Sequence, residues 1–161
     1  MQLKQISEWV NKHDMEVLLS NDEIKSWLLE QGPITERIKL NHYFELNLIR
    51  DEVDKINEHD KIFLDNIEGD IKVREVILLG NNNPLVYAKS YIPILTINNG
   101  LKKLGQLGKK PLGDILFEKN LFQKKETIFT KFLYLKKEYW GRKSKYYVNG
   151  LPISVMEVFL I

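Results

Sequence analysis

Turn signals between strand-like segments restrict the fold of this chain more than any other feature of its sequence. Residues 71–79 and 85–92 are rich in Val, Ile, Leu and Tyr, and a Gly-Asn-Asn-Asn-Pro stretch at 80–84 separates them. Glycine and asparagine tolerate the left-handed backbone of tight turns, and proline favours turns over central strands. We therefore predict an antiparallel hairpin over 71–92.

A second hairpin is predicted near the end of the chain. Asn149-Gly150 is a favoured two-residue turn, and it lies between the strand-like segments 144–148 and 153–160. Further strands are expected at 42–50 and 127–135. Helices are expected at 22–31, capped by Asn21 or Asp22 and stopped by Gly32-Pro33, at 98–108, and from Pro111 onward. This order predicts a single α+β domain over 1–161, with an antiparallel sheet of about six strands.

Two charged residues stand on apolar faces of these strands. Side chains alternate between the two faces of a strand, so Arg74 shares a face with Val76 and Leu78, and Glu157 shares one with Phe159. A charge among aliphatic neighbours is costly unless another group pairs with it. Either protein groups pair with these two residues, or a polar ligand completes a site between them.

Each candidate residue also has a purely structural interpretation. Arg74 can be a buried structural arginine, and Glu157 an edge-strand carboxylate that faces water. Lys89 shares a face with Tyr87 and Tyr91 and can simply lay its stem on their rings. The Trp-Gly-Arg-Lys-Ser stretch at 140–144 can be a basic turn with an aromatic anchor, and the polar stretch 51–70 a solvated connection.

Composition excludes several classes of function. The chain has 161 residues, 43% of them hydrophobic, and a net charge of +2, which does not argue for a nucleic-acid partner. No apolar run approaches the roughly 20 residues of a membrane span, and the N-terminus has no signal-peptide layout. Cysteine is absent, which is typical of a cytoplasmic protein. The three histidines form no metal-binding pair, so we predict no metal site.

Short motifs along most of the chain resemble those of bacterial chorismate lyase, the chorismate–pyruvate lyase of ubiquinone synthesis. Each motif is weak, but the ordered set at compatible spacing is fairly specific. The motifs are Trp-Leu-Leu at 27–29, Val-Arg-Glu-Val-Ile-Leu at 73–78, Pro-Leu-Gly at 111–113, Trp-Gly-Arg-Lys-Ser at 140–144 and Glu-Val-Phe-Leu at 157–160.

The resemblance implies a set of site residues. Arg74 would bind the ring carboxylate of the ligand, Glu157 would meet its ring hydroxyl, and the backbone N–H groups of Ile34 and Leu112 would help to hold it. Lys89 stands where the family is expected to have an arginine, and it would neutralise the side-chain carboxylate of the substrate. A lysine keeps the charge there but loses bidentate recognition. Ile34 replaces an expected methionine, which a backbone donor tolerates.

The resemblance also implies the reaction and the partners. Chorismate would lose pyruvate and give 4-hydroxybenzoate, the first step toward ubiquinone. Because aromatisation drives this reaction, we expect no cofactor. We also expect the enzyme to be a monomer and to be inhibited by its product. The alternative is a non-catalytic domain that binds a small aromatic acid, since the effector domains of some bacterial transcription regulators resemble the same fold.

Overall fold

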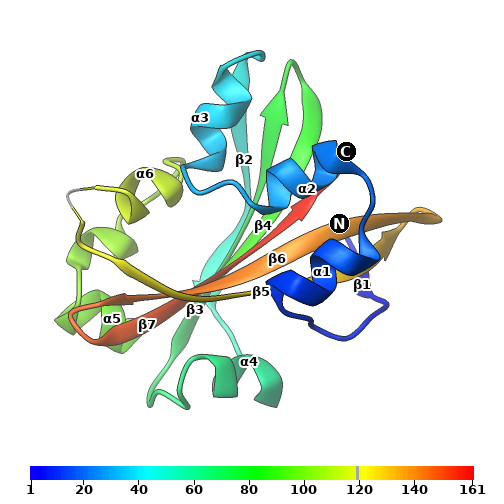
Figure 1. The fold of residues 1–161 in the computed structure, drawn as a ribbon. Coiled ribbons are helices and arrows are strands. Elements are labelled where there is room, and N and C mark those ends of the chain that lie inside the picture. Colours follow the sequence, from blue (N-terminus) through cyan, green and yellow to red (C-terminus); the bar gives the residue numbers. More distant parts are fainter. Residues whose placement is uncertain (119) are drawn as a thin grey trace.

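Seven antiparallel strands form one sheet in the computed structural model, which describes residues 1–118 and 120–161 (Figure 1). The order across the sheet is β1-β5-β6-β7-β4-β3-β2. The predicted α+β class with an antiparallel sheet is confirmed, with one strand more than the six expected. The strands are β1 (Lys4–Gln5), β2 (Phe44–Val53), β3 (Ile71–Gly80), β4 (Asn83–Pro93), β5 (Gln123–Tyr134), β6 (Lys137–Val148) and β7 (Leu151–Phe159).

Three two-residue turns close the hairpins β3–β4, β5–β6 and β6–β7. The residues of these turns, at 81–82, 135–136 and 149–150, all have positive φ. This backbone matches the right-handed twist of the flanking strands. The two turns with asparagine were predicted. The third is Leu135-Lys136, which carries no residue that favours positive φ, so the sequence gives no signal for it.

The helices are short. They are α1 (Lys12–Leu18), α2 (Asp22–Leu28), α3 (Ile34–Lys39), α4 (Glu58–Phe63), α5 (Ile94–Asn99), the 3-10 turn η1 (Lys102–Gly105) and α6 (Gly113–Leu116). The predicted cap of α2 is confirmed, because the Asn21 side chain accepts a hydrogen bond from the Ile24 N–H at 3.1 Å. The helix predicted over 98–108 is wrong: α5 ends at Asn99, and only η1 follows. Helices of this length are not stable alone and depend on packing.

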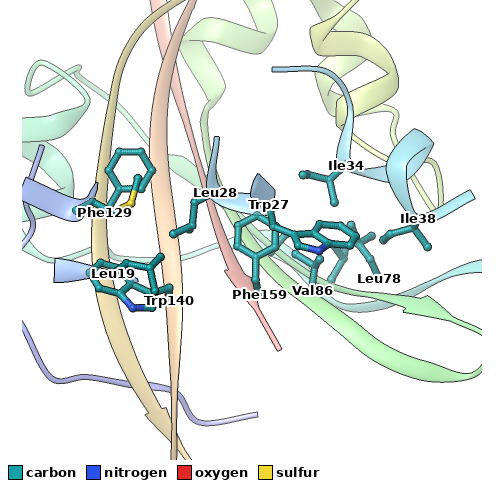
Figure 2. Packing of buried hydrophobic residues seen from close by; sticks show 13 residues of the cluster. Leu19, Trp27, Leu28, Ile34, Ile38, Leu78, Val86, Phe129, Trp140 and Phe159 are labelled. Carbon is teal, nitrogen blue, oxygen red and sulfur yellow. The ribbon is translucent and has the colours of Figure 1, made fainter. Parts of the chain in front are cut away.

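Most helices cover one face of the sheet. Trp27 and Leu28 of α2 belong to a buried cluster with Ile34 and Ile38 of α3 and with Phe159 of β7. Figure 2 shows Trp27 against Phe159, and their ring centroids lie 5.9 Å apart. A second cluster on the same face buries residues of η1 and α6. Helix α4 lies apart from α2 and α3 (Figure 1).

The stretch 140–144 is the middle of strand β6, so its interpretation as a basic turn is wrong. The strand begins at Lys137, seven residues before the predicted start at Ser144. A Cβ atom on Gly141 would lie 2.9 Å from Cε2 of Phe132 and 3.0 Å from the Glu157 carbonyl oxygen. Glycine therefore permits a close approach between β6 and its neighbours here.

The polar stretch 51–70 is more structured than a solvated connection. Strand β2 continues to Val53, and α4 follows. Lys143 is buried, and its ammonium lies 3.2 Å from a carboxylate oxygen of Asp60 in α4. Across residues 1–118 and 120–161, no helix is long and apolar enough to cross a membrane.

Candidate active site

A small cavity of about 50 Å³ lies between the helix-covered face of the sheet and two covering segments. The floor consists of side chains from β2, β3, β4, β6 and β7, and the cover comes from the chain around the starts of α3 and α6. The floor residues are Leu46, Arg74, Val76, Leu78, Ala88, Ser90, Arg142, Tyr146, Val155 and Glu157; the cover residues are Gly32, Pro33, Ile34, Thr35, Pro111, Leu112, Gly113, Leu116 and Phe117.

Arg74 connects this floor to the segment that precedes α6. Its side chain is only 2% exposed, and its two terminal nitrogens donate to the carbonyl oxygens of Gly108 at 2.8 Å and Lys110 at 2.7 Å. An Asp51 carboxylate oxygen lies 3.7 Å away. Burial lowers the pKa of the Arg74 guanidinium, and the Asp51 charge opposes that shift. Arginine stays charged in proteins, so a cation faces the cavity.

Glu157 is held by a second buried arginine. Nε of Arg142 donates to Oε1 of Glu157 at 2.8 Å, and Nη1 donates to the carbonyl oxygens of Leu28 at 3.0 Å and Glu30 at 2.7 Å. A charged hydrogen bond of this kind fixes the orientation of a carboxylate. Beside the pair, burial and the Glu157 charge raise the pKa of Tyr146 to about 12, so its hydroxyl stays protonated at neutral pH.

Two backbone donors lie in the covering segments. Helix α3 begins at Ile34 and α6 at Gly113, and neither helix has a side-chain cap. Within the described residues, the N–H groups of Ile34 and Leu112 donate to no protein acceptor. The first N–H groups of a helix point outward and suit a polar or anionic ligand group.

Four of the five predicted site residues therefore line one cavity, and Lys89 does not. The Asn81-Asn82 turn alone would place Lys89 opposite Arg74. A bulge at Leu85 shifts the register by one residue, so Ser90 is opposite Arg74 and Lys89 is opposite Glu75. A shift of one residue moves a side chain to the other face of the sheet.

On that other face, Lys89 lines a separate hollow together with Trp9, Tyr91 and Lys143. Its ammonium lies 5.6 Å from the centre of the Tyr91 ring. The expectation that Lys89 contacts the same ligand as Arg74 is corrected by this geometry. The structural interpretation of Lys89 agrees with the closeness of its ammonium to the Tyr91 ring.

Arg142 lines the cavity as well, and it was not identified as a candidate from the sequence. Its neighbours Gly141, Lys143 and Ser144 are not apolar, so this stretch lacks the clear apolar alternation of a strand and is typical of a turn. The signal that could have found it is alternation itself, because Trp140, Arg142 and Tyr146 stand at even positions of one strand. No group of three His, Asp or Glu side chains suited to a metal ion occurs within 1–118 and 120–161.

Comparison with known proteins identifies relatives over nearly the whole chain. A family model described as chorismate lyase matches residues 3–161. The probable chorismate pyruvate-lyase of Psychromonas ingrahamii is 30% identical over 158 residues, covering 87% of this chain and 83% of that protein. Its counterpart in Pseudomonas putida is 33% identical over 150 residues, covering 84% and 80%.

Solved structures share the fold at low identity. The PhnF C-terminal domain superposes with a TM-score of 0.56 at 12% identity, covering 80% of this chain and 87% of that one. The C-terminal domain of the histidine utilization repressor from Pseudomonas syringae pv. tomato gives a TM-score of 0.54 at 9% identity, covering 73% and 91%. At these identities the likeness concerns the fold alone.

Proposed function

The chain belongs to the chorismate lyase family, and from this premise we propose that its cavity converts chorismate to 4-hydroxybenzoate and pyruvate, a first step toward ubiquinone. One observation carries the assignment to this cavity. Arg74 and Glu157, far apart in sequence, line the same enclosed space. A cation and a carboxylate across an apolar cavity suit an aromatic acid that has a hydroxyl at its far end.

The chemistry balances without another reactant. The ether bond between C3 of the ring and the enolpyruvyl oxygen breaks, and its electron pair leaves with the oxygen. The proton on C4 is lost, and its bonding electrons complete the aromatic ring. The enolpyruvyl methylene carbon gains one proton and becomes the methyl group of pyruvate. Aromatisation supplies the driving force, so we propose that the reaction needs no metal or redox cofactor.

The residues of the cavity have distinct proposed roles. Arg74 binds the ring carboxylate, and the N–H groups of Ile34 and Leu112 assist it. Glu157 accepts a hydrogen bond from the hydroxyl on C4 and influences proton movement beside it. Arg142 is a positioning residue, because its bond to Glu157 fixes the carboxylate. Positioning and electrostatics then supply most of the acceleration.

The size of the cavity indicates that its cover moves. About 50 Å³ is too small for a benzene ring, which occupies a cavity of roughly 150 Å³ in another protein. The covering segments must therefore open to admit a ligand. Gly32 and Gly113 belong to these segments, and we propose them as the flexible points. Arg74 donates hydrogen bonds to the carbonyl oxygens of Gly108 and Lys110. A ligand carboxylate would compete with these oxygens for the same donors.

Product inhibition follows from the same contacts. The ring carboxylate and the hydroxyl belong to substrate and product alike, so Arg74 and Glu157 contribute binding to both. We also propose that the enzyme is a monomer. Light scattering on the purified protein tests the monomer.

Incubating the purified protein with chorismate and coupling released pyruvate to NADH oxidation tests the proposal. We expect stoichiometric pyruvate and 4-hydroxybenzoate, activity that survives EDTA and dialysis, and slower progress curves when 4-hydroxybenzoate is added. A protein that binds 4-hydroxybenzoate but releases no pyruvate would instead be a binding domain of the kind found in regulators. Activity lost on dialysis and restored by a metal would contradict cofactor independence.

A further inference from the structure

Each arginine of the cavity floor lies near a carboxylate of the protein. Arg74 has the Asp51 carboxylate at 3.7 Å, which also contacts Lys72 at 3.3 Å, and Arg142 has the Glu157 carboxylate at 2.8 Å. The proposed product carries one carboxylate, whereas chorismate carries a second one on its enolpyruvyl group. If Arg74 binds the ring carboxylate, the second carboxylate needs a further cation, because Arg142 is already paired with Glu157 and unpaired charge near a low-dielectric cavity is costly.

A bulge in strand β5 turns a lysine toward the cavity face of the sheet. Glu126 is opposite Lys145, and continuing that register would place Lys124 opposite Tyr147, on the other face. Instead, Lys125 is left unpaired and Lys124 is opposite Tyr146, which lines the cavity. Bulges often occur next to active sites, where they redirect a side chain.

The surroundings of Lys124 leave its charge available. Its Nζ lies 6.0 Å from the centre of the Tyr146 ring. Among residues 1–118 and 120–161, no carboxylate lies within ion-pair distance of it. Desolvation and the nearby Arg142 charge lower the pKa of the Lys124 ammonium, while the Glu157 charge raises it. The residue is exposed and does not line the cavity itself, but it is paired across the strands with Tyr146, which does. The charges of both Arg142 and Glu157 act on its ammonium.

We propose that Lys124 binds the enolpyruvyl carboxylate of chorismate at the rim of the cavity and so distinguishes substrate from product. The inference rests on the proposed function. In chorismate the enolpyruvyl ether is on C3, beside the hydroxyl-bearing C4 that Glu157 is proposed to meet. The second carboxylate therefore lies at the Glu157 end, where Lys124 is. This replaces the role first expected of Lys89.

The test compares two neighbouring lysines of β5. Lys124→Gln removes the proposed contact, and Lys125→Gln removes the same charge from a residue that lines a shallow hollow with Lys145 and Tyr147. For Lys124→Gln we expect kcat/KM for chorismate to fall about tenfold, mainly through a higher KM, because a charged contact at an exposed rim is partly screened. The inhibition constant of 4-hydroxybenzoate should stay within about twofold, since the product lacks that carboxylate.

Lys125→Gln should leave both constants unchanged, and Lys124→Arg should restore most of kcat/KM. An equal loss of product affinity in Lys124→Gln, or an equal loss of kcat/KM in Lys125→Gln, would overturn the inference. A wild-type protein that forms no pyruvate would overturn the proposed function itself. Wild-type turnover with an unaffected Lys124→Gln variant would overturn only the role of Lys124.

Discussion

Two buried arginines connect the cavity floor to different covering segments. Arg74 donates to carbonyl oxygens just before α6, and Arg142 donates to carbonyl oxygens of Leu28 and Glu30, just before the turn into α3. Both residues hold the cover in place as well as facing the cavity. They differ in one respect: Arg142 is bonded to a carboxylate through Nε, whereas the nearest carboxylate to Arg74 lies at 3.7 Å.

The several bonds of Arg142 predict that losing this arginine costs more stability than losing the charge of its partner Glu157. Arg142→Met should lower the free energy of unfolding by about 3–5 kcal/mol, because it leaves Glu157 and two carbonyl oxygens without their donor. Glu157→Gln should cost less, since the amide oxygen still accepts from Arg142, although both variants should lose activity. Urea unfolding of the two proteins measures the order. Equal losses would show that the Arg142 bonds to Leu28 and Glu30 contribute little.

The residues of the site differ in how far the sequence could reveal them. Arg74 and Glu157 stand out because each interrupts an apolar strand face. Arg142 is hidden by polar neighbours. Lys89 was assigned to the ligand from the family resemblance. The bulge at Leu85, which leaves no mark in the sequence, puts its side chain on the face of the sheet opposite to that of Arg74.

At the scale of elements, turn chemistry separates what could be predicted from what could not. The hairpins closed by asparagine-containing turns were found, and β5–β6 was not, because Leu135-Lys136 adopts positive φ without a residue that favours it. Helices α1, α3 and α4 were also missed. They are six or seven residues long, too short for a clear 3.6-residue periodicity, and tertiary packing decides them.

The unfavourable turn predicts a stabilising change. Replacing Leu135-Lys136 with Asn-Gly should raise the free energy of unfolding by about 1 kcal/mol, because both new residues tolerate positive φ. The reciprocal change of Asn149-Gly150 to Ala-Ala should lower it by a similar amount. Thermal unfolding of both variants, with the pyruvate assay as a check on the site, gives the comparison. A destabilised Asn-Gly variant would mean that Leu135 or Lys136 makes contacts that outweigh the backbone cost.

At the scale of the whole molecule, the fold brings distant parts of the chain together around the cavity. The floor comes from five strands, and the cover comes from segments near residues 33 and 112. Sequence pattern predicted the sheet, and the resemblance named four residues that line the cavity, but neither gave the size of the cavity. That property depends on how side chains from many elements pack, and alternation along single strands does not contain this information.

Binding of 4-hydroxybenzoate to Arg74→Ala, measured by calorimetry beside thermal unfolding, tests the central claim most directly. Losing a charged hydrogen bond to a carboxylate costs roughly 1.5–3 kcal/mol, so product affinity should fall by about one to two decades. Lys89→Ala is the matched control, because that lysine lies on the other face of the sheet and should leave affinity unchanged. Unchanged product binding in Arg74→Ala together with a collapsed unfolding temperature would contradict the account and leave Arg74 a structural arginine.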